Sequence, residues 1–288
     1  MQFCTISTIS HLHKAYALAE SIHPFEGKLH VLISDKESKV DIESKHDNIQ
    51  LHSLNDIKAA NTKKIIKKYK GDKLRWSLKP GFLLYLFDSL NVKKVIYIDN
   101  DICFFNNPKF LFEKLEKQSL LLSPHFYPSD PEKKQNWLEA NLRLGLFNAG
   151  FIAANKGAIE ALRWWEKCCL YKMKRAYYRG LFDDQKYLDL IPVLFEKVEI
   201  LKHRGCNLAG WNSEIKMKNE EILFIHFNPY TLNQFSSPSH MYHSFFKQYV
   251  EMVKKYKLNY APPRNKASLF KVESYIIYLI WKAEQLLH

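Results

Sequence analysis

The sequence lacks the glycine and cysteine patterns that mark several common classes of enzyme and binding protein. None of its nine glycines forms a Gly-x-Gly, so neither a dinucleotide-binding GxGxxG nor a P-loop GxxxxGK[ST] is present. The five cysteines are odd in number and form no CxxC pair, which argues against a disulfide scaffold and against a zinc site. This cysteine usage favours a reduced, cytoplasmic protein.

Long apolar runs are also missing. No run reaches the roughly 18 apolar residues that a membrane span needs. The first 20 residues have no basic start followed by a long apolar stretch, so we expect no signal peptide. The net charge of +13 is concentrated in residues 58–79 and 247–288. Such a surplus attracts polyanions, anionic lipids or phosphorylated small molecules, or reflects a general lysine bias with no partner at all.

Apolar strands alternate with helix-like segments along the chain. Near-continuous apolar runs such as VLIS, KVIYI and ILFIH indicate a sheet covered on both faces, which predicts an α/β fold. We expect strands close to residues 2–9, 29–35, 93–105, 119–125, 145–157, 198–201 and 222–228. We expect helices close to residues 13–22, 57–70, 80–90, 108–117, 158–172 and 182–195, and a helix-like remainder from about residue 239.

Two carboxylates interrupt the apolar run VIYIDNDICFF. In extended chain, Asp99 and Asp101 project to the same side, just past a buried strand. Open α/β sheets bind ligands at the carboxyl ends of their strands, where Asp35 and His226 are also expected. A pair of acids in that place suits Mg²⁺ or Mn²⁺. Alternatively, one acid caps the following turn and the other faces solvent.

The order of four motifs carries a family resemblance. VIYIDND, LFNAGF, FDDQKYLDLIP and FIHFN resemble the motifs of GT-A nucleotide-sugar glycosyltransferases, in the branch of glycogenins and bacterial lipopolysaccharide galactosyltransferases. That branch has YLDAD, FNSG, DQD and a late histidine, and the resemblance covers roughly Phe3 to Asn228. It implies a GT-A fold, a Rossmann-like, mostly parallel mixed sheet flanked by helices. We predict a GT-A catalytic domain over residues 1–238 and a C-terminal helical extension over residues 239–288.

The resemblance also implies roles for individual residues. Asp99, Asp101 and His226 would hold Mn²⁺ or Mg²⁺, although a lone histidine at a strand end is often a hydrogen-bonded core residue. Asp184 and Gln185 match the first letters of DQD and would be catalytic, whereas Lys186 departs from the third letter. Arg75 and Lys79 would grip the donor diphosphate, or form the solvated face of a basic helix. The donor-binding residues would be Thr5, Ile6, Ser7, Arg75, Lys79, Asp99, Asn100, Asn148, Ala149 and Gly150.

The implied reaction transfers a sugar from a nucleoside diphosphate sugar, with UDP favoured, to a hydroxyl of a glycan or glycolipid acceptor. Lipopolysaccharide or another bacterial surface polysaccharide, or its lipid-linked precursor, would be the product, and retention of configuration is favoured. The basic, aromatic tail at residues 268–287 suits peripheral contact with the inner membrane face, and equally a helix docked on the domain or on a second copy.

Two alternative functions stay open at this point. A phosphate-ester hydrolase could use the DxD strand, but Cys103 occupies the place where such enzymes have Thr or Val. A basic nucleic-acid-binding protein is the other alternative. The sequence contains no recognised nucleic-acid motif, so we expect no nucleic-acid partner.

Overall fold

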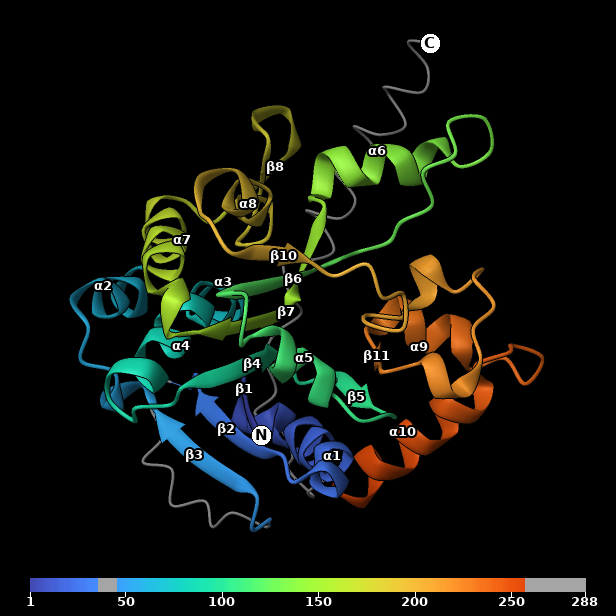
Figure 1. The fold of residues 1–288 in the computed structure, drawn as a ribbon, viewed down its shortest axis with the longest axis horizontal. Coiled ribbons are helices and arrows are strands. Elements are labelled where there is room, and N and C mark those ends of the chain that lie inside the picture. Colours follow the sequence, from blue (N-terminus) through green and yellow to red (C-terminus); the bar gives the residue numbers. More distant parts are fainter. Residues whose placement is uncertain (36–45, 257–288) are drawn as a thin grey trace, which may run out of the picture. The chain divides into compact units, whose positions relative to one another are not determined.

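A seven-stranded mixed sheet forms the centre of the computed structural model, which describes residues 1–35 and 46–256 (Figure 1). Its strands are β1 (Gln2–Ser7), β2 (Lys28–Ile33), β3 (Ile49–Ser53), β4 (Lys94–Ile98), β6 (Leu120–Pro124), β7 (Phe147–Asn155) and β10 (Val198–Ile200). The strand order is β10-β6-β7-β4-β1-β2-β3. Only β7 runs antiparallel to its neighbours β4 and β6 among these strands, and the other pairs are parallel. The predicted α/β fold with a mostly parallel mixed sheet is confirmed.

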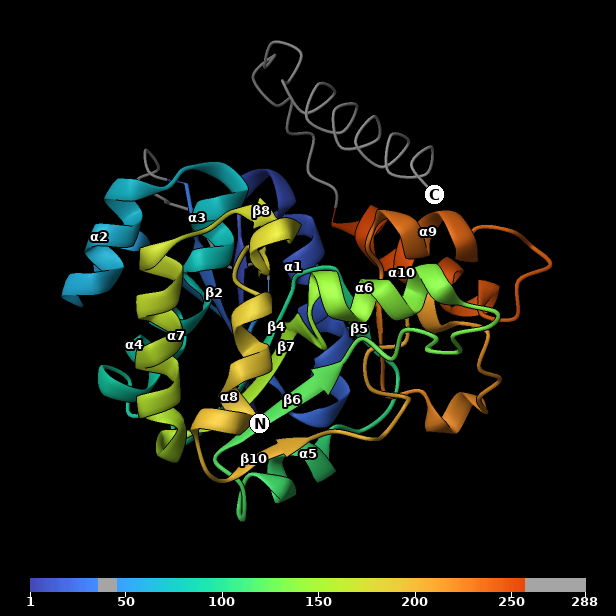
Figure 2. The same ribbon diagram turned by 90° about the horizontal axis from the view of Figure 1, so that it is seen from above.

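The apolar strands are buried on both faces, as their sequences predict. In β4, Val95 and Tyr97 pack into one hydrophobic cluster, and Ile96 and Ile98 pack into another. Because successive side chains of a strand point to opposite faces, both faces of the sheet must be covered. The helices α4 (Lys79–Asp88) and α7 (Ile159–Tyr171) cover the first face, and α1 (Leu12–Ile22) covers the second (Figure 2).

Further α-helices complete the fold. They are α2 (Ala60–Lys68), α3 (Gly71–Ser77), α5 (Lys109–Lys114), α6 (Gln135–Leu144), α8 (Ile191–Leu194), α9 (Pro229–Phe235) and α10 (His243–Lys255). The helix α10 lies within a compact unit that spans Met1–Lys257, and its Tyr249 stacks on Phe227 with ring centroids 4.1 Å apart. The predicted tail helix at residues 268–287 lies outside the described residues.

The strand predicted over residues 93–105 is wrong as a continuous element. It ends at Ile98, and the N–H of Ile102 donates to Asp99 O at 3.1 Å, which closes a turn over the two acids. The chain then enters β5 (Ile102–Phe104), which pairs antiparallel with β11 (Phe224–His226) in a separate two-stranded sheet. Asp99 and Asp101 therefore belong to the turn that joins the two sheets.

The helix predicted over residues 182–195 is also wrong. A short hairpin of β8 (Arg175–Ala176) and β9 (Leu181–Phe182) precedes Asp183, whose φ of 44° is left-handed. A right-handed helix cannot run through that residue. The segment instead continues as a 3₁₀ helix at Lys186–Leu190 and the single turn α8. Strand β3 and helices α3, α6 and α9 lie outside the predicted elements.

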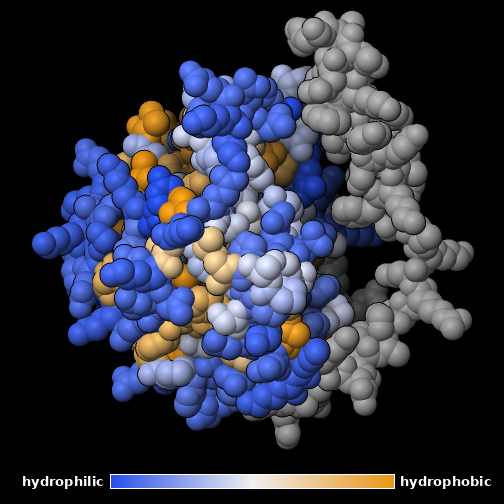
Figure 3. All heavy atoms as spheres, turned by 90° about the vertical axis from the view of Figure 1, so that its right-hand side faces the viewer, coloured by the Kyte–Doolittle hydropathy of each residue, from blue (hydrophilic) through white to orange (hydrophobic). Residues whose placement is uncertain are grey.

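Within the described ranges, no helix combines the length and the hydrophobicity needed to cross a bilayer. Figure 3 views the right-hand side of Figure 1, which carries α9 and α10. This face is mostly hydrophilic, and its hydrophobic residues occur in small separate patches.

Candidate active site

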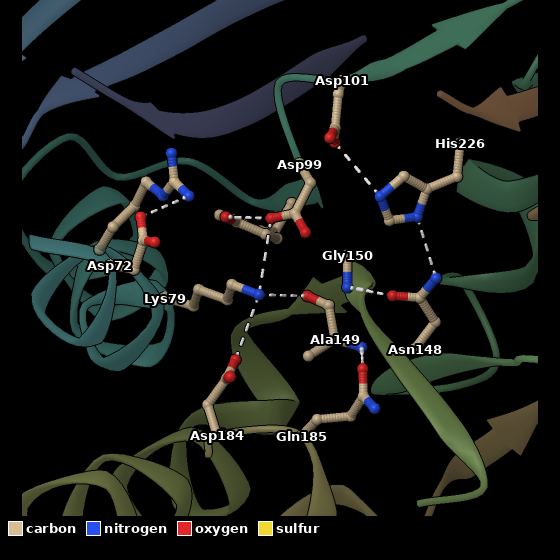
Figure 4. Close-up of polar contacts among 12 residues, drawn as sticks. Asp72, Lys79, Asp99, Asp101, Asn148, Ala149, Gly150, Asp184, Gln185 and His226 are labelled. Carbon is tan, nitrogen blue, oxygen red and sulfur yellow. Dashed lines mark hydrogen bonds and ion pairs between the residues drawn. The ribbon is translucent and has the colours of Figure 1, made fainter. Parts of the chain in front are cut away.

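The two sheets bring the predicted metal ligands together (Figure 4). The strand β7 lies beside β4, and the N–H of Asp99 donates to Gly150 O at 2.9 Å. The strand β11 lies beside β5, and the N–H of Phe227 donates to Asp101 O at 2.7 Å. As a result, ligand atoms of Asp99, Asp101 and His226 all lie within 4.8 Å of one another. Strands distant in the sequence thus assemble one Asp-Asp-His group.

This group fits a hard divalent cation. Two carboxylates suit Mg²⁺ or Mn²⁺, and an imidazole nitrogen shifts the preference toward a transition metal such as Mn²⁺. Gly150 leaves the space beside the three side chains open. A Cβ atom there would lie 2.9 Å from Asp99 Oδ2 and 3.0 Å from His226 Cε1. The glycine therefore lets the side chains of Asp99 and His226 approach the backbone at position 150 more closely than a residue with a Cβ would allow.

Asp101 and His226 form an ion pair, with Oδ1 3.2 Å from Nε2. Burial favours the neutral carboxyl, but the charge and hydrogen bond of His226 bring the pKa of Asp101 below its ordinary value. Burial likewise favours the neutral imidazole, but Asp101 raises the pKa of His226 above its ordinary value. A cation bound by the imidazole must displace this proton, because only neutral histidine ligates metals.

Lys79 is a buried cation between two acids. It is 2% exposed, and its Nζ lies 3.1 Å from Asp184 Oδ2 and 3.5 Å from Asp99 Oδ1. It also donates to Ala149 O at 3.0 Å, while Tyr97 donates its hydroxyl to Asp99 Oδ1 at 2.8 Å. Burial lowers the pKa of Lys79, but the two carboxylates raise it more. Burial raises the pKa of Asp184 to about 6, with Lys79 acting in the opposite direction.

Asn148 orients the histidine and the glycine of the site. Its Oδ1 accepts from the N–H of Gly150 at 2.7 Å, and its Nδ2 lies 3.0 Å from His226 Nδ1. The same Nδ2 donates to Asn207 Oδ1 at 2.8 Å. Asn207 was not predicted from the sequence; it lies in the stretch CNLAGWN between two strands. Both asparagine side chains are buried, so this network fixes the imidazole ring.

The segment after Asp184 is held to the start of β7. Gln185 accepts from the N–H of Ala149 at 3.3 Å through Oε1 and donates to Leu144 O at 3.0 Å through Nε2. Lys186, which departs from the DQD motif, forms an ion pair with Asp189 at 2.8 Å. Lys186 is thus paired with a nearby acid. Asp184 and Gln185 lie beside the segment from Asn148 to Gly150, because Lys79 contacts both Asp184 and Ala149, and Gln185 contacts Ala149 directly.

The end of β1 reaches the same edge of the sheet. Ser7 Oγ accepts from Asn100 Nδ2 at 3.0 Å, which ties the β1 loop to the turn between the two acids. Thr5 and Ser7 are both buried, and the side chain of Ile6 belongs to the hydrophobic core. Any contact of Ile6 with a ligand must therefore use its backbone.

Arg75 lies on α3, whose Asp72 is drawn beside the site in Figure 4. Its Nη2 pairs with Asp72 Oδ1 at 2.9 Å, one helical turn away. The guanidinium is only partly exposed and its charge opposes protonation of Lys79. Arg75 and Lys79 thus add positive charge on one side of the Asp-Asp-His group, where a diphosphate would need it.

A hollow lies at the opposite edge of the sheet from the Asp-Asp-His group. It has a volume of about 570 Å³, and its lining includes Gln2, Lys28 and His30 near the starts of β1 and β2. Ligands of open α/β sheets bind at the carboxyl ends of strands, so we place the active site at the Asp-Asp-His group.

Comparison with known proteins identifies relatives of the chain. No protein-family model matches it. The uncharacterized protein YfnF of Bacillus subtilis (strain 168) is 30% identical over 226 residues, which cover 73% of this chain and 71% of YfnF. The chain belongs to the YfnF family. The uncharacterized protein YfnD of the same organism is 25% identical to this chain over 253 residues, which cover 80% of this chain and 78% of YfnD.

Solved structures identify the fold of this YfnF-family member. The galactosyltransferase LgtC, solved with donor and acceptor sugar analogs, matches with a TM-score of 0.54 at 14% identity, covering 91% of this chain and 98% of LgtC. GlyE of Streptococcus pneumoniae TIGR4 and the bifunctional WbbM each match with a TM-score of 0.53 at 14% identity. Each covers 88% of this chain, and the matches span 62% of GlyE and 49% of WbbM. The chain has the GT-A fold, as predicted.

Proposed function

We propose that this YfnF-family protein is a metal-dependent glycosyltransferase. It transfers a sugar from a nucleoside diphosphate sugar, most simply a UDP-sugar, to a hydroxyl of a glycan or glycolipid acceptor. The observation that carries this proposal is the Asp99-Asp101-His226 group, whose ligand atoms lie within 4.8 Å of one another at the carboxyl edge of a GT-A sheet. Diphosphates bind hard divalent cations, and such a group supplies the protein ligands that these cations need.

The chemistry of the transfer sets what the site must do. The bond between the anomeric carbon and the diphosphate oxygen breaks, and a bond from that carbon to the acceptor oxygen forms. The proton of the acceptor hydroxyl passes to the departing diphosphate, which balances the reaction. When bound, Mn²⁺ or Mg²⁺ would neutralise charge on the leaving diphosphate. Asp99, Asp101 and His226 would hold it.

Lys79 and its partners have a positioning role in this proposal. The ammonium group holds Asp99 and Asp184 on its two sides, at 3.5 and 3.1 Å. Asp184 would accept hydrogen bonds from hydroxyls of the donor sugar, and Gln185 would support the strand segment of Asn148, Ala149 and Gly150. Fixed charges in a buried site stabilise a transition state strongly, because they need no reorganisation as the reaction proceeds.

Retention of configuration is the stereochemistry we favour. An inverting transfer needs a carboxylate base beside the acceptor. Of the acids described here, Asp99 and Asp101 are committed to the metal group, and Asp184 pairs with Lys79. The acceptor would then attack from the face of the leaving group.

The biological setting completes the proposal. A bacterial surface polysaccharide such as lipopolysaccharide, or its lipid-linked precursor, would be the acceptor. All five cysteines are free thiols in the structure, which suits a reducing compartment such as the cytoplasm. Peripheral contact with the membrane would come from the basic C-terminal tail, which lies outside the described residues.

Turnover of nucleotide sugars tests the proposed function. The full chain is incubated with a panel of UDP-, GDP- and CDP-sugars, with Mn²⁺ or with excess chelator, and release of the nucleoside diphosphate is measured. We expect release from at least one UDP-sugar only with the metal, and a loss of at least about 100-fold in Asp101→Asn. Asp88→Asn, at an exposed position of α4, is the matched control and should keep full activity. Equal turnover in chelator, or in Asp101→Asn, would reject the metal-dependent mechanism.

A further inference from the structure

An aromatic wall leads away from the metal group toward the start of α6. We define it as Tyr127, Trp137, Trp211 and Tyr230. Its first member, Trp211, contacts His226 edge to face, with ring centroids 5.6 Å apart at 78°. The ring centroid of Tyr127 lies 5.9 Å from that of Trp211. Trp137 stacks on Tyr127, with ring centroids 5.2 Å apart and an interplanar angle of 22°. The wall is therefore continuous from a metal ligand to α6.

The wall is held rigidly by the residues behind it. His125 stacks on Tyr127 with ring centroids 4.5 Å apart at 6°, and its carbonyl accepts from Trp211 Nε1 at 2.7 Å. Tyr230, which is 44% exposed, contacts Trp137 at 6.2 Å. These contacts fix the rings before any ligand arrives, which lowers the entropic cost of binding.

A hollow lies where the wall reaches α6. Its volume is about 290 Å³, and it is lined by Glu132, Lys133, Lys134, Gln135, Asn136 and Trp137. Asp130 fixes the adjoining loop, because its Oδ1 accepts from the N–H of Glu132 at 2.9 Å and of Lys133 at 3.2 Å. In this hollow the partly exposed indole of Trp137 thus lies beside carboxylate, amide and ammonium side chains.

The wall lies on the side of the site away from the expected donor loop. The order β6-β7-β4-β1 places the end of β6, from which residues 125–137 continue, and the end of β1 on opposite sides of β7 and β4, the strand that precedes Asp99. The β1 side carries Ser7 and Asn100, where the donor nucleoside is expected. The β6 side is left for the acceptor.

We propose that the aromatic wall and the hollow form an extended acceptor subsite for a saccharide chain of two or more sugars. This inference rests on the proposed function and names the class of acceptor. A pyranose ring presents an apolar C–H face and a rim of hydroxyls. Aromatic rings match the face, and a few placed polar groups match the rim. The rings of Trp211, Tyr127 and Trp137 contact one another in that order from His226 outward, so a chain of two or more sugars that starts at the metal group can follow them.

Binding of defined glycans tests this subsite. The full chain, with Mn²⁺ and UDP, is applied to an array of bacterial and plant oligosaccharides of one to five sugars, and affinities are then measured in solution for those that bind. We expect binding to at least one chain of two or more sugars, and a loss of at least about tenfold in Trp137→Ala. Trp164→Ala, which removes a partly exposed tryptophan on α7, is the matched control and should bind as the wild type does.

Two further variants keep the test decisive if Trp137→Ala lowers the melting temperature. Trp137→Leu keeps apolar bulk without an aromatic face, and Trp137→Phe keeps a face. The subsite requires weaker binding by Trp137→Leu than by Trp137→Phe. Absence of binding to every oligosaccharide by the wild type, or equal binding by Trp137→Leu and the wild type, would overturn it.

The same samples separate this inference from the proposed function. Wild-type protein that turns over a UDP-sugar with Mn²⁺ but binds no oligosaccharide overturns the subsite alone. Wild-type protein that binds an oligosaccharide through Trp137 but turns over no nucleotide sugar supports the saccharide site and overturns the transferase.

Discussion

The ammonium group of Lys79 lies 3.1 Å from the carboxylate of Asp184, and both side chains are almost completely buried. The same ammonium group lies 3.5 Å from Asp99, a predicted metal ligand. One buried cation therefore links the acid proposed to bind the donor sugar to the metal group. This link explains how β4, α4 and the segment after β9 keep a common geometry at the site.

Loss of this cation should destabilise the fold. In Lys79→Met, Asp184 and Asp99 lose their shared partner, and breaking a buried ion pair by removing one partner costs about 3–5 kcal/mol. The free energy of unfolding, measured by urea denaturation, should fall by that amount. Lys109→Met on α5, where the lysine is exposed, is the matched control and should change it by less than about 0.5 kcal/mol.

A double variant distinguishes a lost ion pair from lost packing. Asp184→Leu added to Lys79→Met removes the uncompensated carboxylate, so it should recover part of the lost stability. A double variant that is less stable than Lys79→Met alone would show that the charge of Asp184 is not what Lys79 compensates.

The raised pKa of Asp184 should make stability depend on pH. Burial raises this pKa from its ordinary value to about 6, so the folded state holds the proton more tightly than the unfolded chain does. The associated stability is fully present below the unfolded pKa and is lost as the pH rises through about 6. The shift corresponds to about 3 kcal/mol. Relative to Asp184→Asn, the wild type should lose roughly this amount between about pH 3.5 and 7. A difference that stays constant or grows with pH would contradict the assignment.

Metal affinity should rise with pH. Asp101 raises the pKa of His226, so metal binding must displace a proton from the imidazole. Isothermal titration with Mn²⁺ should show affinity increasing up to about tenfold per pH unit until the imidazole is neutral. His226→Asn should bind Mn²⁺ at least about tenfold more weakly and lose this pH dependence. His23→Asn, at an exposed position, should behave as the wild type. An unchanged pH profile in His226→Asn would remove this histidine from the ligand set.

Gly150 should matter to metal binding more than to folding. In Gly150→Ala, the new methyl group would lie 2.9 Å from both Asp99 Oδ2 and Asn148 Oδ1, so the acid must move. We expect Mn²⁺ affinity to fall at least about tenfold. Gly180→Ala meets no atom within 4 Å but has a φ of +63°, so it should cost about 1 kcal/mol of stability and leave Mn²⁺ affinity unchanged. Equal Mn²⁺ affinities in the two variants would contradict the close approach at Gly150.

The central strands were predictable from local sequence, and the metal group was predictable from the family resemblance. KVIYI is apolar at every inward position, because both faces of β4 are buried. The motif order was enough to bring Asp99, Asp101 and His226 together as candidates. Their assembly by a turn and a second sheet was not predictable, because the pairing of β5 with β11 joins segments about 120 residues apart in the sequence.

The acceptor side of the site was not predictable in the same way. Helix α6 (QNWLEANLRL) was not predicted from the sequence, and Ala140 is its one buried residue, so it packs little of its surface against the core. The aromatic wall joins Tyr127, Trp137, Trp211 and Tyr230 from three separate segments, and none of these lies in a motif. The left-handed conformation of Asp183, which excluded the predicted helix, likewise depends on its burial and its hydrogen bond with Arg175.

Calorimetric titration with UDP tests the central claim most directly. Asp99, Asp101 and His226 are proposed to bind the divalent cation that holds the donor diphosphate. Wild-type protein should therefore bind UDP in the presence of Mn²⁺ and lose this binding in excess chelator, and Asp101→Asn should not bind UDP under either condition. UDP binding of equal affinity with Mn²⁺ and with chelator would contradict the account.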